Sequence, residues 1–60
     1  MSAHDFLITR AVAFAVRAGH SDAVAHRFLE ALCDAGVLGQ ERQYGPMLAQ
    51  LMRQTEKEEA

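Results

Sequence analysis

Apolar side chains recur along the chain with the spacing of an α-helix, and no segment alternates polar and apolar residues as a half-buried strand does. The spacing predicts helices over about residues 3–18, 21–35 and 46–56. An irregular stretch over 36–45 holds three of the four glycines, and an acidic tail over 57–60 is expected to fray because its charge opposes the helix dipole. The predicted fold is all-α, a helical hairpin followed by a shorter C-terminal helix in a single domain over residues 1–60.

Residue types that commonly begin and end helices stand at the predicted boundaries. Ser2 and Ser21 are suitable N-caps, and Ser2 opens a sequence that resembles a capping box. Gly19 ends the first helix, and Gly36 suits the left-handed residue of a Schellman ending after the second. Pro46 fits the first position of the third helix.

The 21–35 helix is amphipathic. Its apolar stripe consists of Val24, Ala25, Phe28, Leu29, Ala31, Leu32 and Ala35. Its polar side carries His26, Glu30 and Asp34 at four-residue intervals. This pattern is typical of a helix with one buried face.

The 3–18 helix is apolar over roughly 200° of its circumference, where one contact face needs roughly 100°. The arc consists of Leu7, Ile8, Ala11, Val12, Phe14, Ala15, Val16 and Ala18. Only one other strong helix is available to cover it, and small chains without disulfides or metals commonly gain stability by association. We therefore expect a homodimer with this helix near the two-fold axis. The expected dimer interface is Leu7, Ala11, Phe14, Ala15 and Ala18; a three-helix monomer is the alternative.

A second line of residues follows the opposite side of the same helix. Phe6, Arg10, Ala13 and Arg17 form a continuous stripe that combines an aromatic ring with two arginines, residue types enriched at binding hot spots. With Tyr44 in the predicted loop, these are the candidate partner-binding residues. Phe6 could equally complete a hydrophobic cap at the end of the bundle. Met47 and Met52 are expected to fill the core.

Composition and charge narrow the functional classes. The 60 residues are 50% hydrophobic, which excludes disorder over most of the chain, and the net charge of −2 disfavours a basic nucleic-acid binder. Cys33 is the one cysteine, so an internal disulfide is excluded, and we expect it in the core or an interface. No apolar run approaches the roughly 20 residues of a membrane span, and residues 1–5 lack the basic start of a signal peptide. We therefore expect a cytoplasmic protein. Arginine outnumbers lysine five to one and alanine is abundant, as is typical of GC-rich bacterial or phage genomes, so we also expect a complete small gene product of a bacterium, phage or plasmid.

The residues that could carry chemistry are scattered. His4, His20, His26 and Cys33 lie on different turns, without the clustered spacing that a structural zinc needs. The glycines match no phosphate-binding loop, and Cys33 lacks an evident activating group. We therefore expect no metal, no cofactor and no enzymatic activity.

The turn between the first two helices resembles a helix-turn-helix in part. Ala15, Gly19 and Phe28 occupy positions that the motif requires, whereas His20 and Ala25 depart from it, and an aspartate near the start of the second helix would repel phosphate. The main hypothesis is a non-catalytic helical adaptor, regulator or inhibitor that binds a larger protein. A dimeric DNA-binding regulator is the alternative, and a subunit completed by another chain is a weaker third.

Overall fold

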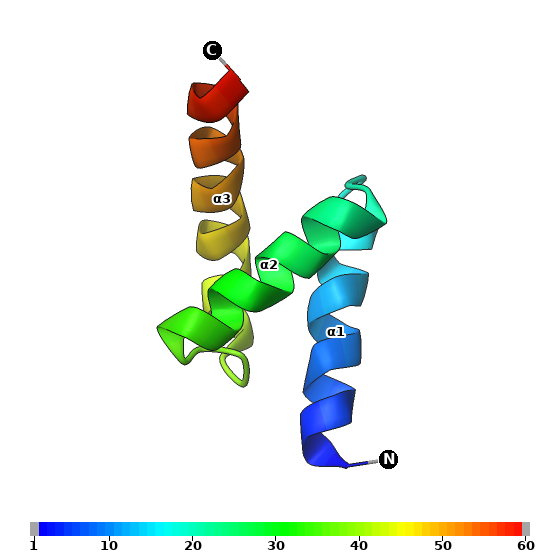
Figure 1. Cartoon of the computed structure of the whole chain (residues 1–60). Helices are drawn as coiled ribbons and strands as arrows, with labels where there is room; N and C mark the ends of the chain where they lie inside the picture. The colour runs from blue at the N-terminus through cyan, green and yellow to red at the C-terminus, as the bar shows by residue number, and fades with distance from the viewer. Residues whose placement is uncertain (1, 60) are drawn as a thin grey trace.

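The computed structural model describes residues 2–59, which form three α-helices and one short 3₁₀ turn and contain no strand. The elements are α1 (Ala3–Arg17), α2 (Asp22–Ala35), η1 (Glu41–Gln43) and α3 (Tyr44–Glu59). In Figure 1, α2 crosses diagonally between α1 and the base of α3, and the last turns of α3 extend beyond α2. The all-α helical bundle predicted from the sequence is confirmed.

Serine caps begin the first two helices as predicted. The Ser2 hydroxyl accepts a hydrogen bond from the Asp5 amide at 3.1 Å, and the Ser21 hydroxyl accepts one from the Val24 amide at 3.3 Å. Each bond satisfies one of the amides that a helix start leaves without an intrahelical partner. The starts of α1 and α2 therefore follow from local sequence alone.

Both helices of the hairpin end at a glycine in the left-handed region, Gly19 at φ 95° and Gly36 at φ 71°. In each case the amide of the following residue donates to a carbonyl five residues earlier, which is the Schellman pattern. These bonds are His20 to Ala15 at 3.2 Å and Val37 to Leu32 at 3.0 Å. The Schellman ending predicted at Gly36 is confirmed.

The third helix is longer than its pattern predicted. It begins at Tyr44, two residues before Pro46, which the first turn tolerates because the amides there have no intrahelical acceptor. It also continues through residues 57–59, where the sequence predicted fraying. Lys57 in the last turn offsets the acidic residues, and the Glu58 carboxylate lies 3.6 Å from the Arg27 guanidinium on α2. Ala60, the last residue of the predicted tail, lies outside the described residues.

The core forms where α2 crosses its neighbours. Its buried residues are Ala11, Ala15, Ala25, Phe28, Leu32, Tyr44, Leu48 and Leu51. Met47 and Met52 pack against this cluster and are half-buried, as expected of core-filling residues. The α2 stripe predicted from the sequence supplies Ala25, Phe28 and Leu32, whereas α1 supplies only two alanines.

Candidate functional site: an aromatic groove beside α1

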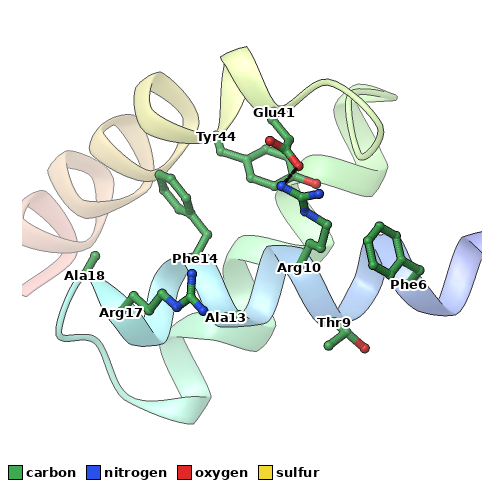
Figure 2. A pocket seen from close by; sticks show the side chains of 9 residues that line it. All are labelled: Phe6, Thr9, Arg10, Ala13, Phe14, Arg17, Ala18, Glu41 and Tyr44. Carbon is green, nitrogen blue, oxygen red and sulfur yellow. Dashed lines mark ion pairs between the residues drawn. The ribbon is translucent and has the colours of Figure 1, made fainter.

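An open groove of about 770 Å³ lies between α1 and the segment that leads into α3. We call it the aromatic groove. It is lined by Phe6, Thr9, Arg10, Ala13, Phe14, Arg17, Ala18, Glu41 and Tyr44 (Figure 2). All five residues predicted to bind a partner therefore surround one concave surface, to which α2 contributes no lining residue.

Helical spacing explains how α1 forms one wall of the groove. Phe6, Arg10, Ala13 and Arg17 follow each other at intervals of three or four residues, so their side chains lie on one side of the helix. The Phe6 ring is 51% exposed, the largest exposure among the large apolar side chains. This degree of exposure argues against Phe6 as a cap on the core.

Arg10 connects the two walls. Its guanidinium lies 5.5 Å from the centroid of the Phe6 ring and forms an ion pair with Glu41 of η1. Figure 2 shows the Arg10 side chain pointing from α1 across to Glu41. Both charged side chains are about half exposed, so water screens the pair and its contribution to stability is small. The ion pair is therefore a contact that another charged group can replace.

Two aromatic rings, Phe14 and Tyr44, line the groove at its other end, and Phe28 of α2 packs against both of them. The Phe14 ring centroid lies 5.8 Å from that of Phe28 and 5.6 Å from that of Tyr44, and the Phe28 and Tyr44 centroids are 5.7 Å apart. Phe28 and Tyr44 are buried, whereas Phe14 is 38% exposed. Phe14 thus joins the core through its two neighbours and presents the rest of its ring to solvent.

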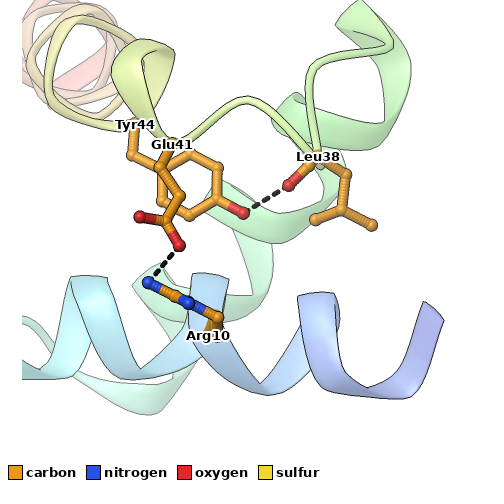
Figure 3. A network of polar contacts seen from close by, with 4 residues as sticks. All are labelled: Arg10, Leu38, Glu41 and Tyr44. Atoms are coloured by element: carbon orange, nitrogen blue, oxygen red, sulfur yellow. Dashed lines mark hydrogen bonds and ion pairs between the residues drawn. The ribbon is translucent and has the colours of Figure 1, made fainter. Parts of the chain in front are cut away.

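Tyr44 corrects one sequence-based prediction. It was expected in a loop as an exposed anchor, but it is the first residue of α3 and only 2% exposed. Its hydroxyl donates a hydrogen bond to the Leu38 carbonyl, which ties the loop after α2 to the start of α3 (Figure 3). The sequence could not indicate this, because the burial of Tyr44 depends on the fold of the whole 36–43 segment. Tyr44 supports the floor of the groove and offers little surface to a partner.

Burial also changes the acidity of this phenol. The pKa of Tyr44 lies above the ordinary value of 10.0, chiefly because burial removes the hydroxyl from water. The Glu41 carboxylate, and more weakly Cys33, also favour the neutral phenol, whereas the Arg10 guanidinium acts in the opposite direction. The hydroxyl therefore stays protonated as the donor of its bond to Leu38.

The residues predicted for the dimer interface fall into two groups. Ala11 and Ala15 have no exposed surface, since they pack against the core within the single chain, and their assignment to the interface is wrong. Their small side chains permit the close approach of α2, whereas the sequence was expected to bring a second copy of the chain to these residues. Leu7 is half-buried, and Phe14 and Ala18 line the aromatic groove.

Two features of α1 and η1 were not identified from the sequence as parts of a site. Glu41 stands in a polar run of the irregular stretch, and only the fold brings its carboxylate beside Arg10. Val16, assigned to the apolar arc, is 44% exposed and lies outside the groove lining. Helical spacing separated Val16 from the stripe of Phe6, but it could not tell which part of the arc the chain would leave uncovered.

Outside the groove the potentially reactive residues lie apart. Within residues 2–59 no three side chains of His, Cys, Asp or Glu are grouped as a metal ion requires. Cys33 is exposed, so its predicted place in the core is wrong, and its place in an interface stays a prediction. The surface of α2 that a helix-turn-helix would turn toward DNA carries Asp22, His26, Glu30 and Asp34, all exposed.

Comparison with known proteins identified no relative of this chain. No family model, no curated protein and no solved structure matches the chain. Among the described helices none combines the length and apolar character needed to cross a membrane. The functional proposal therefore rests on the geometry of the groove.

Proposed function

We propose that this chain is a non-catalytic protein–protein interaction module, a small helical adaptor, regulator or inhibitor that docks onto a larger protein through the aromatic groove. The observation that carries the proposal is the exposure of two phenylalanines, Phe6 and Phe14, beside Arg10 and Arg17. Exposed rings flanked by arginines are typical of binding hot spots and not of an inert surface. A groove of this shape suits a helix of the partner protein.

The polar groups of the groove favour binding over catalysis. The Thr9 hydroxyl donates to the Asp5 carbonyl at 3.0 Å, the Tyr44 hydroxyl donates to the Leu38 carbonyl, and Glu41 pairs with Arg10. Nucleophilic catalysis needs a nucleophile within reach of a base that activates it. These groups instead pair with each other or with the backbone, so we assign the groove neither a catalytic residue nor a cofactor. We also propose a cytoplasmic location.

Homodimerisation through α1 is part of the proposal, on a different surface from the one first expected. Ile8, Val12 and Val16 follow each other at four-residue intervals on α1 and do not line the groove; Ile8 and Val12 are half-buried, Val12 against the core, so Val16 offers most of the free apolar surface. This apolar strip carries no charge and ends in the exposed Val16. A standard interface removes about 800 Å² from each partner, a large share of the 4234 Å² that this chain exposes. Three side chains cannot supply an interface of that area, so we expect weak, concentration-dependent association. Sedimentation of Val16→Asp, compared with the unaltered chain, tests this expectation.

DNA binding is the competing proposal, and one observation favours it. Gly19 adopts the left-handed conformation in the turn between α1 and α2, as a helix-turn-helix glycine does. The charge of α2 opposes it, because Asp22, Glu30 and Asp34 would face the phosphates. Strong retention on duplex DNA at low salt, lost at moderate salt, would favour this alternative.

Site-specific photocrosslinking in the source cells tests the docking proposal. A photoreactive phenylalanine analogue replaces Phe6 in the groove or, as the matched control, Val16, which is also exposed on α1 but outside the groove. We expect one discrete adduct with a larger protein from position 6, abolished by Arg17→Glu, and no such adduct from position 16. Equal adducts from both positions, or none from position 6, would contradict the proposal. An adduct of twice the chain mass would identify a second copy.

A further inference from the structure

The charges of this chain are segregated. A second hollow adjoins the aromatic groove and shares Phe6, Arg10 and Glu41 with it; we call it the side hollow, and Arg42 is among its other lining residues. The two concavities together contain three arginines and one glutamate, an excess of two positive charges, although the whole chain has a net charge of −2. The concave surface is therefore positive on an acidic protein.

The single carboxylate in this surface lies in contact with one of the arginines. Glu41 reaches the Arg10 guanidinium from the opposite wall, at the boundary between the aromatic groove and the side hollow (Figure 3). Arg17, by contrast, has no ion-pair partner among the described side chains. Glu41 thus occupies, within the chain, the kind of position that a carboxylate of a bound partner would take.

The aromatic residues determine the second property of an occupant. Phe6 and Phe14 are eight residues apart on α1, which corresponds to about 12 Å along a helix. Apolar side chains at positions i, i+4 and i+7 of a second helix span a similar length. A helix that lies along α1 can therefore contact both rings while its flanks face Arg10 and Arg17.

From these observations we infer that the aromatic groove binds an acidic amphipathic helix of the partner protein, whose carboxylates pair with Arg17 and displace Glu41 from Arg10. The inference rests on the proposed function and names the chemistry of the partner. Exchange of one carboxylate for another at a half-exposed ion pair conserves charge pairing, so it needs little reorganisation. Glu41 acts as an internal competitor that tunes the affinity.

Other occupants fit this surface less well. A second copy bound groove to groove would bring the same three arginines of each chain face to face, because a two-fold interface opposes identical patches. A nucleic acid duplex would meet three arginines, but also Glu41, whose charge repels phosphate, and two phenylalanine side chains without hydrogen-bond donors. An acidic helix satisfies the rings and the charges together.

Three designed peptides test the inference. Each is a labelled helix about four turns long with leucine at i, i+4 and i+7, and the flanking positions carry glutamate, glutamine or lysine. Fluorescence anisotropy measures their binding to the folded chain. We expect the glutamate peptide to bind at least about tenfold more tightly than the glutamine peptide, and the lysine peptide not to bind. Equal binding of all three, or tighter binding of the lysine peptide, would overturn the inference.

Variants of the chain separate the roles of the charged residues. Arg17→Glu should weaken binding of the glutamate peptide by about tenfold or more, whereas Arg53→Glu, an exposed arginine of α3 outside the groove, should leave it unchanged. Glu41→Gln should tighten binding, because the internal competitor is removed. Circular dichroism confirms that each variant is folded. Unchanged or weaker binding by a folded Glu41→Gln variant would overturn the displacement of Glu41.

The two proposals can fail separately. A protein adduct from position 6 together with equal binding of the three peptides would retain the docking function and overturn the acidic helix as its occupant. Absence of the adduct together with selective binding of the glutamate peptide would retain the chemistry of the groove and overturn its use for docking in the cell. A labelled DNA duplex that binds more tightly than the glutamate peptide and is lost on Arg17→Glu would overturn the choice of a protein segment.

Discussion

Helices α1 and α2 are nearly equal in length and begin with the same kind of serine cap, yet they bury different kinds of side chain. Helix α2 inserts Phe28 and Leu32 fully into the core. Helix α1 contributes only Ala11 and Ala15 as buried residues and leaves its largest apolar side chains partly in water. The same local rules therefore produced one helix that is covered by its own chain and one that is not.

The difference between α1 and α2 matters because the two helices bury different amounts of apolar area. The free energy gained by burial scales with the apolar area removed from water, and an alanine removes little of it. The alanine face lets α2 approach closely, but α1 is held largely by what α2 inserts beside it. Phe6 and Phe14 remain available in the groove, and Val16 outside it. A chain that leaves such residues uncovered is suited to binding another molecule.

Replacement of Phe28 by alanine should have the largest effect on folding. Loss of a fully buried phenylalanine costs about 3–5 kcal/mol, which is comparable with the whole stability of a chain of this size. We expect Phe28→Ala to be largely unfolded at 25 °C, as far-UV circular dichroism and urea titration would show. A cooperative unfolding transition close to that of the unaltered chain would contradict the assignment of α2 as the main source of the core.

Replacement of Phe14 by alanine tests the same contrast from the side of α1. Its ring packs against Phe28 and Tyr44 but is 38% exposed, so we expect a loss of about 1–2 kcal/mol with the fold retained. Urea unfolding of Phe14→Ala and Phe28→Ala under the same conditions provides the comparison. Equal losses would mean that α1 contributes to the core as strongly as α2. A clearly smaller loss for Phe14→Ala than for Phe28→Ala would confirm the difference between the helices.

Tyr44→Phe examines the link between the loop and α3. Removal of the hydroxyl should cost about 1 kcal/mol at neutral pH, because the bond to the Leu38 carbonyl is lost. The unaltered chain should also lose stability as the pH rises above about 10. In that range Tyr44 ionises in the unfolded chain. In the folded chain burial and the Glu41 carboxylate raise the pKa of Tyr44, so its hydroxyl stays protonated to higher pH. The unfolded state therefore binds fewer protons than the folded state. Between pH 8 and pH 11 the urea midpoint of Tyr44→Phe should fall less than that of the unaltered chain. An equal fall for both proteins would contradict the assignment of the pH effect to Tyr44.

Local signals allowed much of the fold to be predicted. The serine caps and Gly36 define the hairpin because they act within one helical turn, and the α2 stripe identified its buried face from spacing alone. The stripe of Phe6, Arg10 and Arg17 was also predictable, since residues on one helix face share it in any fold. These features need no information about which elements are neighbours.

Features that depend on tertiary neighbours were predicted less well. The sequence indicated that Ala11 and Ala15 permit close helix packing, but not that α2 of the same chain is the partner. Tyr44 stands among polar and glycine residues, so only the path of the 36–43 segment reveals its burial. Glu41 meets Arg10 across 31 positions of sequence, and neither residue carries a local signal of that contact.

The smallest effects are expected for two exposed side chains of α1, Phe6 inside the groove and Val16 outside it. Phe6→Ser should lose about 0.5–1 kcal/mol with its contact to Arg10, and Val16→Ser should change stability by less than about 0.5 kcal/mol. Thermal unfolding at low protein concentration measures both values in the single chain. Sedimentation at high concentration should separate the variants, since self-association is proposed for the surface around Val16 and not for Phe6. A loss well above 1 kcal/mol at either position would mean that α1 is covered by its own chain in solution, and the contrast with α2 would disappear.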